Sequence, residues 1–176
     1  VVGRMAGVDI PVQPRRRQIY FTPPYGKLPM KLPMIIDFNS GWYFRREGEL
    51  ILMAGSVDDE PSYNMNTDFE GMLWAAERAS HRVPILEEAG ISSGWAGLYE
   101  ISPDNHAILG RVPEVEGFIA ANGFSGHGFQ HGPVSGKVIA ELIVYGEART
   151  IDISPLSIER FKKGDLLVEP ITAFQD

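Results

Sequence analysis

The chain has 176 residues, of which 44% are hydrophobic and 22% charged, an ordinary composition for a globular protein. Its formal net charge of −7 argues against a large nucleic-acid-binding surface, which needs a basic stripe. The sequence has no cysteine, which excludes disulfides and cysteine-based zinc sites, and it has neither an apolar run long enough to span a membrane nor a secretory signal at its start. The absence of cysteine does not indicate the redox compartment, and a cytoplasmic location is the expectation.

The first half of the chain is predicted to form a sheet of short strands. Residues 15–22 have the composition of a strand, and they are followed by a proline-rich loop. Three further strands are predicted at 34–38, 42–46 and 50–55, separated by glycines. This spacing is typical of an antiparallel meander.

A helix is predicted after these strands. Thr67 and Glu70 match the S/T-x-x-E capping box, and apolar residues then recur at three- and four-residue spacing. Pro84 either ends this helix or opens a short one, and residues 91–101 have the composition of a strand.

The second half ends in a strand and a well-marked helix. Residues 117–123 are predicted to form a short buried strand. Pro133 suits the first turn of the following helix, because its missing N–H costs nothing there, and Gly146 suits the C-cap.

The segment between them, residues 123–133 (GFSGHGFQHGP), is rich in glycine. The P-loop pattern fails because His131 stands five residues before Gly136, where a glycine is required, and the order of the glycines does not fit G-x-G-x-x-G. His127 and His131 have the spacing of a zinc helix, but the glutamate of H-E-x-x-H is absent, so no metal site is predicted. Two alternatives remain: a tight strand-to-helix connection, or bare N–H groups that approach a flat ligand carrying negative charge.

Residues 97–143, above all "SPDNHAILG" and "GFSGHGF", resemble the C-terminal part of the FAD-dependent amine and amino-acid oxidoreductases. Within this D-amino acid oxidase-like superfamily, the chain resembles the branch of sarcosine oxidase and dimethylglycine dehydrogenase. The opening "AGVDIPVQPRRRQ" and the tail "DISPLSIERF" fit the same branch, so the resemblance covers nearly the whole chain. It implies a C-terminal fragment of a longer protein, which agrees with a first residue other than methionine.

The resemblance implies an α+β fold with a mixed, largely antiparallel sheet and helices. Residues 1–110 are expected to form the substrate-binding (cap) domain. Residues 111–150 are expected to form the C-terminal part of the FAD-binding α/β domain, with its last strand and helix, and residues 151–176 a tail. The family's G-x-G-x-x-G fingerprint lies in an N-terminal part that this sequence does not include.

The resemblance also implies FAD as cofactor, with the backbone N–H groups of the glycine-rich loop directed at the flavin C2 carbonyl. The expected cofactor-binding residues are Gly123, Ser125, Gly126, His127, Gly128 and Phe129. Tyr43 and Arg45 are expected at the substrate, where a guanidinium would pair with a carboxylate, although a surface arginine is the open alternative. Gln130 stands where sarcosine oxidases have a lysine that helps to hold the substrate carboxylate. No catalytic residue is assigned.

The implied reaction is oxidation of the C–N bond of a small secondary or tertiary amino acid, sarcosine-, dimethylglycine- or proline-like, with transfer to FAD. Leu52 and Met53 stand where oxidases of this group carry a lysine that promotes reaction with oxygen, which favours a dehydrogenase. The expected partners are the amino acid and an electron-accepting protein or subunit. The alternative is a non-catalytic fragment or interaction subunit that binds no cofactor alone.

Overall fold

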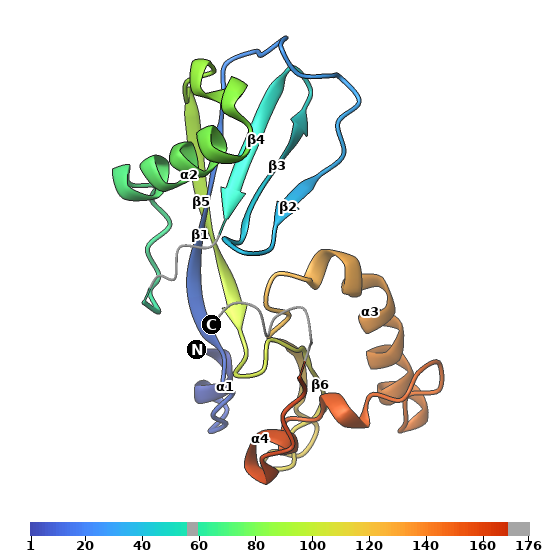
Figure 1. Ribbon diagram of the computed structural model, residues 1–176. Helices are drawn as coiled ribbons and strands as arrows, with labels where there is room; N and C mark the ends of the chain where they lie inside the picture. The colour runs from blue at the N-terminus through green and yellow to red at the C-terminus, as the bar shows by residue number, and fades with distance from the viewer. Residues whose placement is uncertain (56–59, 169–176) are drawn as a thin grey trace. The chain divides into compact units, whose positions relative to one another are not determined.

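The computed structural model describes residues 1–55 and 60–168, which belong to two compact units (Figure 1). Among the described residues, one unit contains Arg15–Leu98, and the other joins Val1–Pro14 to residues 99–168. The division cuts through residues 1–110, which the sequence predicts as one substrate domain, and the functional assignment of the domains stays a prediction. Part of the predicted tail, residues 169–176, lies outside the described residues.

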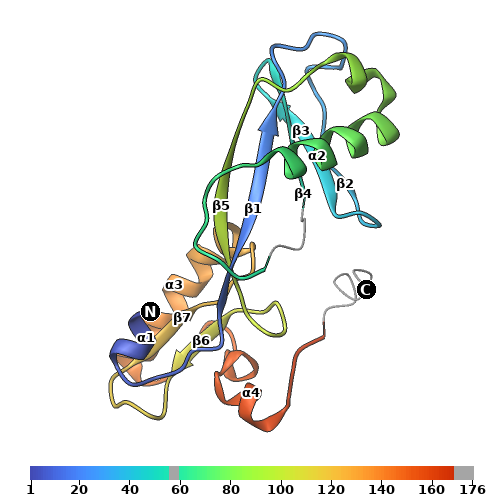
Figure 2. The same cartoon turned by 90° about the vertical axis from the view of Figure 1, so that its left-hand side faces the viewer.

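The first half of the chain contributes a five-stranded sheet in the order β2-β3-β4-β1-β5. Antiparallel pairing joins β2 to β3, β3 to β4 and β4 to β1, and β5 runs beside β1 (Figure 2). The predicted meander and the α+β class are thereby confirmed. The strands are β1 (Gln13–Phe21), β2 (Ile35–Asp37), β3 (Trp42–Glu47), β4 (Leu50–Gly55) and β5 (Ser93–Ile101).

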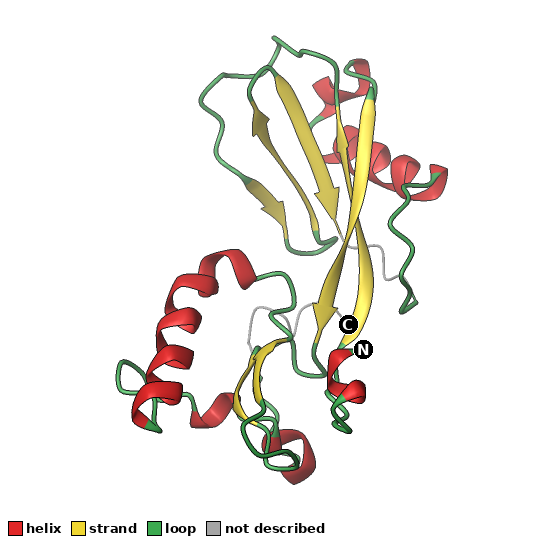
Figure 3. Cartoon of the chain, turned by 180° about the vertical axis from the view of Figure 1, so that it is seen from behind, coloured by secondary structure: helices red, strands yellow, loops and turns green. Residues whose placement is uncertain are grey.

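Helix α2 (Phe69–Arg82) and the short 3-10 helix η1 (Pro84–Glu88) lie on one side of this sheet (Figure 3). Alternation along β3 directs Trp42 and Phe44 to that side, where their rings stack with centroids 5.0 Å apart. The remaining buried members of this core come from β4, α2, η1 and nearby loops: Tyr25, Ile51, Met53, Ala79, Leu86 and Ala89.

The N-cap of α2 is Asp68, so the prediction of a capping box at Thr67 and Glu70 is wrong by one residue. The Asp68 carboxylate accepts the Gly71 N–H at 2.8 Å, and Arg16 of β1 donates to its other oxygen at 2.6 Å. Only a carboxylate can cap the helix and pair with this arginine at once, because the threonine hydroxyl is uncharged.

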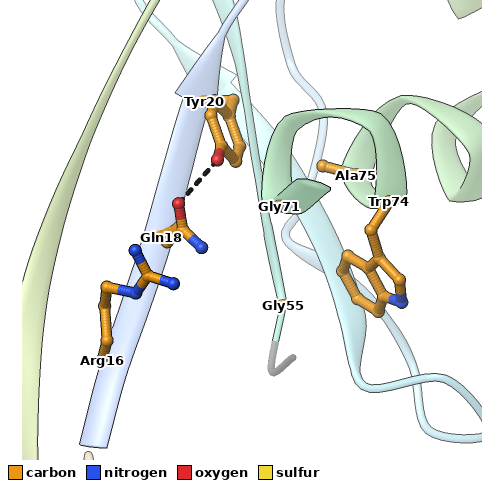
Figure 4. A pocket seen from close by; sticks show the side chains of 7 residues that line it. All are labelled: Arg16, Gln18, Tyr20, Gly55, Gly71, Trp74 and Ala75. Carbon is orange, nitrogen blue, oxygen red and sulfur yellow. Dashed lines mark hydrogen bonds between the residues drawn. The ribbon is translucent and has the colours of Figure 1, made fainter. Parts of the chain in front are cut away.

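Polar side chains of β1 fasten the sheet to the start of α2. Figure 4 shows Arg16, Gln18 and Tyr20 directed at α2 around a small cavity. Gln18 is buried, and its Oε1 accepts from the Tyr20 hydroxyl at 2.8 Å and from the Asp68 N–H at 2.9 Å. The polar side chains that line the cavity thus form hydrogen bonds with one another or with Asp68, and these bonds join β1 to α2.

The other unit is built on an antiparallel hairpin of β6 (Ile108–Arg111) and β7 (Ile119–Asn122). The prediction of a strand over 117–123 agrees with β7, whereas β6 was not predicted. One side of the hairpin packs on α3 (Gly128–Tyr145) through Leu109, Val138 and Leu142. A second cluster of buried residues comprises Val8, Ile108, Val112, Ala120 and Ile158. The short helices of this unit are α1 (Val2–Met5), η2 (Ser154–Leu156) and α4 (Glu159–Lys163).

Helix α3 begins at Gly128, which is earlier than the prediction that Pro133 lies in its first turn. Pro133 therefore lies inside the helix, where it cannot donate to the carbonyl of Phe129. The first turn of the helix is closed by the His131 N–H, which donates to the His127 carbonyl at 3.1 Å. Within the described parts of the chain, none of the helices has the length and apolar character that crossing a membrane requires.

Replacing Gly71 by alanine tests the joint between β1 and α2. An added Cβ would lie 2.5 Å from Gln18 Nε2 and 2.8 Å from the Tyr20 hydroxyl, and both side chains are held by hydrogen bonds. We expect Gly71→Ala to lower the free energy of unfolding by about 1–3 kcal/mol in urea titrations. The control is Gly136→Ala in α3, where the added Cβ meets open space. A Gly71→Ala variant as stable as this control would contradict the packing described.

Candidate functional site

Residues 123–127 connect β7 to α3 through a sharply folded backbone. Gly123, Ser125 and Gly126 have φ values of +71°, +51° and +96°. Only glycine adopts such values without steric cost, so Ser125 must be held in place by its surroundings. The glycine-rich composition of this segment is thus explained in part by its turns.

The loop amides fall into two groups. The Ser125 N–H donates to the Glu100 carbonyl at 3.2 Å, and the His127 N–H donates to the Phe124 carbonyl at 2.9 Å. The N–H groups of Gly126, Gly128, Phe129 and Gln130 have no acceptor among the residues that the structure describes, and we call these the free amides. The last three are first-turn donors of α3, which no carbonyl of the helix can satisfy.

The free amides lie in an exposed stretch. The side chains of His127, Phe129, Gln130 and His131 are all exposed, and apolar Phe129 is 96% exposed. The His127 and His131 rings stack with centroids 5.7 Å apart. Across the described ranges, no group of three or more His, Cys, Asp or Glu side chains is arranged to hold a metal. The partial positive charge of a helix N-terminus and unpaired N–H donors together favour an anionic group.

Position 126 requires glycine for two reasons, its positive φ and a neighbouring aromatic ring. A Cβ on this residue would lie 2.3 Å from Tyr99 Cε2, well inside van der Waals contact. Gly128 differs, because a Cβ there would meet Phe124 at an ordinary 3.4 Å. The backbone therefore lies too close to the Tyr99 ring for a side chain at Gly126, whereas Gly128 has room for a methyl group.

Behind the loop lies a buried ion pair that the sequence did not reveal. The Arg160 guanidinium binds the Asp104 carboxylate through two parallel hydrogen bonds of 2.7 and 2.9 Å, and the two side chains are 3% and 1% exposed. Asp104 lies in the turn before β6, and its carboxylate accepts the His106 N–H at 3.2 Å. Burial alone would raise the pKa of Asp104, but the bonds from Arg160 and from the backbone of Leu167 and His106 lower that pKa to about 2.

Tyr43 and Arg45 lie in the other unit, on the side of β3 opposite to Trp42 and Phe44. Their cross-strand partners on β4 are Ala54 and Leu52. Arg45 forms an ion pair with Glu47 at 2.6 Å, and both side chains are nearly half exposed.

The structure thus brings the predicted site residues together in two groups. Tyr43 and Arg45 share one face of the sheet. The predicted cofactor residues and Gln130 share the loop and the start of α3. The two groups belong to different units, and each is described by itself.

Sequence comparison places the chain among flavoproteins. The profile of the family described as "DAO: FAD dependent oxidoreductase" matches residues 1–142. The chain is 36% identical over 174 residues to FAD-dependent oxidoreductase domain-containing protein 1 of Xenopus laevis, covering 94% of this chain and 34% of that protein. It is 29% identical over 170 residues to human mitochondrial sarcosine dehydrogenase, covering 91% of this chain and 18% of that protein. The chain therefore spans about a third, or less, of the length of these relatives.

Comparison with solved structures also finds amino-acid oxidoreductases. The L-proline dehydrogenase of P. horikoshii matches with a TM-score of 0.86 and 30% identity, over 94% of this chain and 45% of that one. The glycine oxidase of Geobacillus kaustophilus matches with a TM-score of 0.77 and 24% identity, over 90% of this chain and 42% of that one, which shows the fold alone. The resemblance to amine and amino-acid oxidoreductases and the α+β class are both confirmed.

The depressed pKa of Asp104 predicts a contribution to stability that depends on pH. The carboxylate stabilises the fold above its unfolded pKa of 3.8, and the contribution is lost as pH falls towards the folded value of about 2. We expect Asp104→Asn to be strongly destabilised at pH 6, because Arg160 is left buried without its partner. The difference in unfolding free energy from the unsubstituted protein should shrink by about 2 kcal/mol towards pH 2. A difference that stays constant between pH 6 and pH 2.5 would contradict this reasoning.

Proposed function

The chain belongs to the DAO family of FAD-dependent oxidoreductases, and from this premise we propose that it forms the substrate-binding part of a flavoprotein that oxidises the C–N bond of a small secondary or tertiary amino acid. Sarcosine, dimethylglycine and proline are the substrates of this class that the named relatives and the earlier resemblance favour. The observation that carries the proposal is the set of free amides at Gly126, Gly128, Phe129 and Gln130.

The free amides fit FAD by their chemistry. A reduced flavin carries negative charge around N1 and the C2 carbonyl oxygen, and N–H donors directed there stabilise it. Among the described residues no carbonyl competes for these donors, and the start of α3 adds partial positive charge. The proposed cofactor contacts are the backbone of Gly126, Gly128 and Phe129, with Gly123 and Ser125 shaping the loop and His127 beside it. When bound, FAD would accept the hydride equivalent of the substrate.

Arg45 is the proposed partner of the substrate carboxylate. Its side chain is nearly half exposed on the face of β3 opposite to Trp42 and Phe44, and Tyr43 lies two residues away on that face. Glu47 already pairs with Arg45, so a substrate carboxylate would have to compete with it. Gln130 is exposed at the first turn of α3 and could donate to a carboxylate, although its amide adds no charge.

The apolar strand β4 supports a dehydrogenase rather than an oxidase. Leu52 and Met53 are 5% and 2% exposed, and Leu52 lies opposite Arg45 in the strand register. No cation therefore stands at the positions where oxidases of this group were expected to carry a lysine. The proposed electron acceptor is a partner protein or subunit, and the names of two relatives, sarcosine dehydrogenase and L-proline dehydrogenase, agree with this choice.

Anaerobic titration of the full-length protein tests the reaction. We expect the FAD-loaded protein to lose its flavin absorbance with sarcosine, dimethylglycine or L-proline, and we expect this chain alone to bind FAD far more weakly. Gly126→Ala should weaken FAD binding at least tenfold, because the added Cβ clashes with Tyr99. Gly128→Ala is the matched control, since its Cβ meets only an ordinary contact. Unchanged flavin absorbance with every small amino acid would overturn the substrate class.

Paired substitutions on β3 test the substrate contact. We expect Arg45→Gln to raise KM for the amino acid about tenfold or more with little change in kcat, because a charge-assisted bond to the carboxylate is lost. Glu47→Gln should lower KM or leave it unchanged, since it frees Arg45 from its present partner. If both substitutions leave KM unchanged, Arg45 is a surface arginine and the substrate carboxylate is held elsewhere.

A further inference from the structure

Ser125 adopts its unfavourable backbone conformation under several constraints. A φ of +51° costs a non-glycine residue about 1–2 kcal/mol. Its N–H is held by the Glu100 carbonyl at 3.2 Å, and its hydroxyl donates to the Gly123 carbonyl at 3.1 Å. The same hydroxyl accepts the Ser102 N–H at 3.1 Å. The free amides begin at the next residue, Gly126, so the conformation of Ser125 decides where they lie.

Ser102 connects this loop to the turn before β6. The residue is 2% exposed, and its hydroxyl donates to the His106 carbonyl at 2.7 Å, closing the turn. Its oxygen also lies 3.3 Å from Asp104 Oδ1 and 3.4 Å from Ser125 Oγ. A shift of this turn would therefore move the N–H that Ser125 accepts.

Arg160 holds the same turn from a distant part of the sequence. Besides its two bonds to Asp104, its Nη2 donates to the His106 carbonyl at 2.9 Å. Its Nη1 donates to the Leu156 carbonyl at 2.9 Å, and the guanidinium lies over the Phe161 ring. The guanidinium is thus fixed on several sides and makes none of these bonds to the glycine-rich loop.

We propose that Arg160 and Asp104 are positioning residues for the glycine-rich loop, acting through Ser102 and Ser125 to keep the free amides of Gly126, Gly128, Phe129 and Gln130 available for a ligand. The hydrogen bonds form one continuous path. The Arg160 guanidinium binds the Asp104 carboxylate and the His106 carbonyl, and the same carbonyl accepts from the Ser102 hydroxyl. The Ser102 N–H then donates to the Ser125 hydroxyl. That the ligand is a flavin rests on the proposed function, whereas the control of the loop conformation does not.

Hydrogen exchange in the full-length protein, without added FAD, tests this path. The protected amides of Ser125 and His127 are the probes, read from peptides that cover residues 123–131. We expect Ser102→Ala, Ser125→Ala and Arg160→Lys each to speed exchange there about tenfold, while exchange in β3 and β4 stays unchanged. Because the two serines act in one path, the Ser102→Ala/Ser125→Ala double variant should be no faster than the faster single variant.

Two substitutions in the other unit are matched controls. Arg82→Lys disrupts a two-bond pair with Asp37 that has the same geometry but is more exposed, with distances of 2.8 and 2.9 Å, and Ser80→Ala removes a hydroxyl that donates to Ala76. Neither control should change exchange in residues 123–131. Should Arg160→Lys unfold the protein as a whole, the two serine variants decide the question.

The outcomes separate this inference from the proposed function. If the serine variants leave loop exchange unchanged, or if their effects simply add, the positioning path is refuted even when the protein oxidises an amino acid. If the path holds but the protein takes up no FAD, the proposed function alone fails. Where FAD binds, Ser125→Ala should also lower the equilibrium constant for flavin reduction about tenfold, which is about 30 mV for a two-electron couple. An unchanged flavin reduction potential in Ser125→Ala would overturn the inference that the loop conformation acts on the bound flavin.

Discussion

The ion pair of Asp104 and Arg160 is the interaction on which the unit that carries the glycine-rich loop depends. Two charged side chains that are almost fully buried are tolerated only when every lone pair and donor is matched, because desolvation of each ion costs several kcal/mol. Here the carboxylate also accepts the backbone N–H groups of His106 and Leu167, and the guanidinium donates to carbonyls on both sides. The pair therefore joins two segments that are far apart in sequence, residues 104–106 and 156–167.

The glycine-rich loop combines the two explanations that its sequence left open. It is a tight strand-to-helix connection, because positive φ values and local hydrogen bonds account for Gly123, Ser125 and the His127 amide. It also presents a row of free amides, because the first-turn donors of α3 are unpaired, as in any helix, and Gly126 adds one more donor beside them among the described residues. Gly126 serves both the tight connection and the row of free amides. Its φ and its contact with Tyr99 exclude a side chain, and its N–H is among the free amides.

Much of the fold was predictable from local patterns, and the errors have identifiable causes. Short apolar strands punctuated by glycine predict the meander, and the apolar spacing after residue 68 predicts α2. The start of α3 was placed too late because proline normally marks a first turn, whereas here unpaired first-turn donors precede it. Asp68 and Arg160 were missed as structural residues because their partners lie about 50 residues away along the chain, and no local pattern reports such pairs.

The difference between local patterns and distant pairs also bears on how the proposed site would work. Backbone amides can stabilise charge on a flavin whatever the side chains are, so the sequence needs only glycines and a rigid support and need not carry an acid–base dyad. Relatives named for sarcosine, proline and glycine can accordingly share this fold while their substrates differ. In the proposed function, discrimination between substrates falls to side chains such as Arg45 and Gln130, which can change without altering the backbone of the loop. The support, in contrast, depends on Arg160 and Ser125, whose replacement would alter the backbone itself.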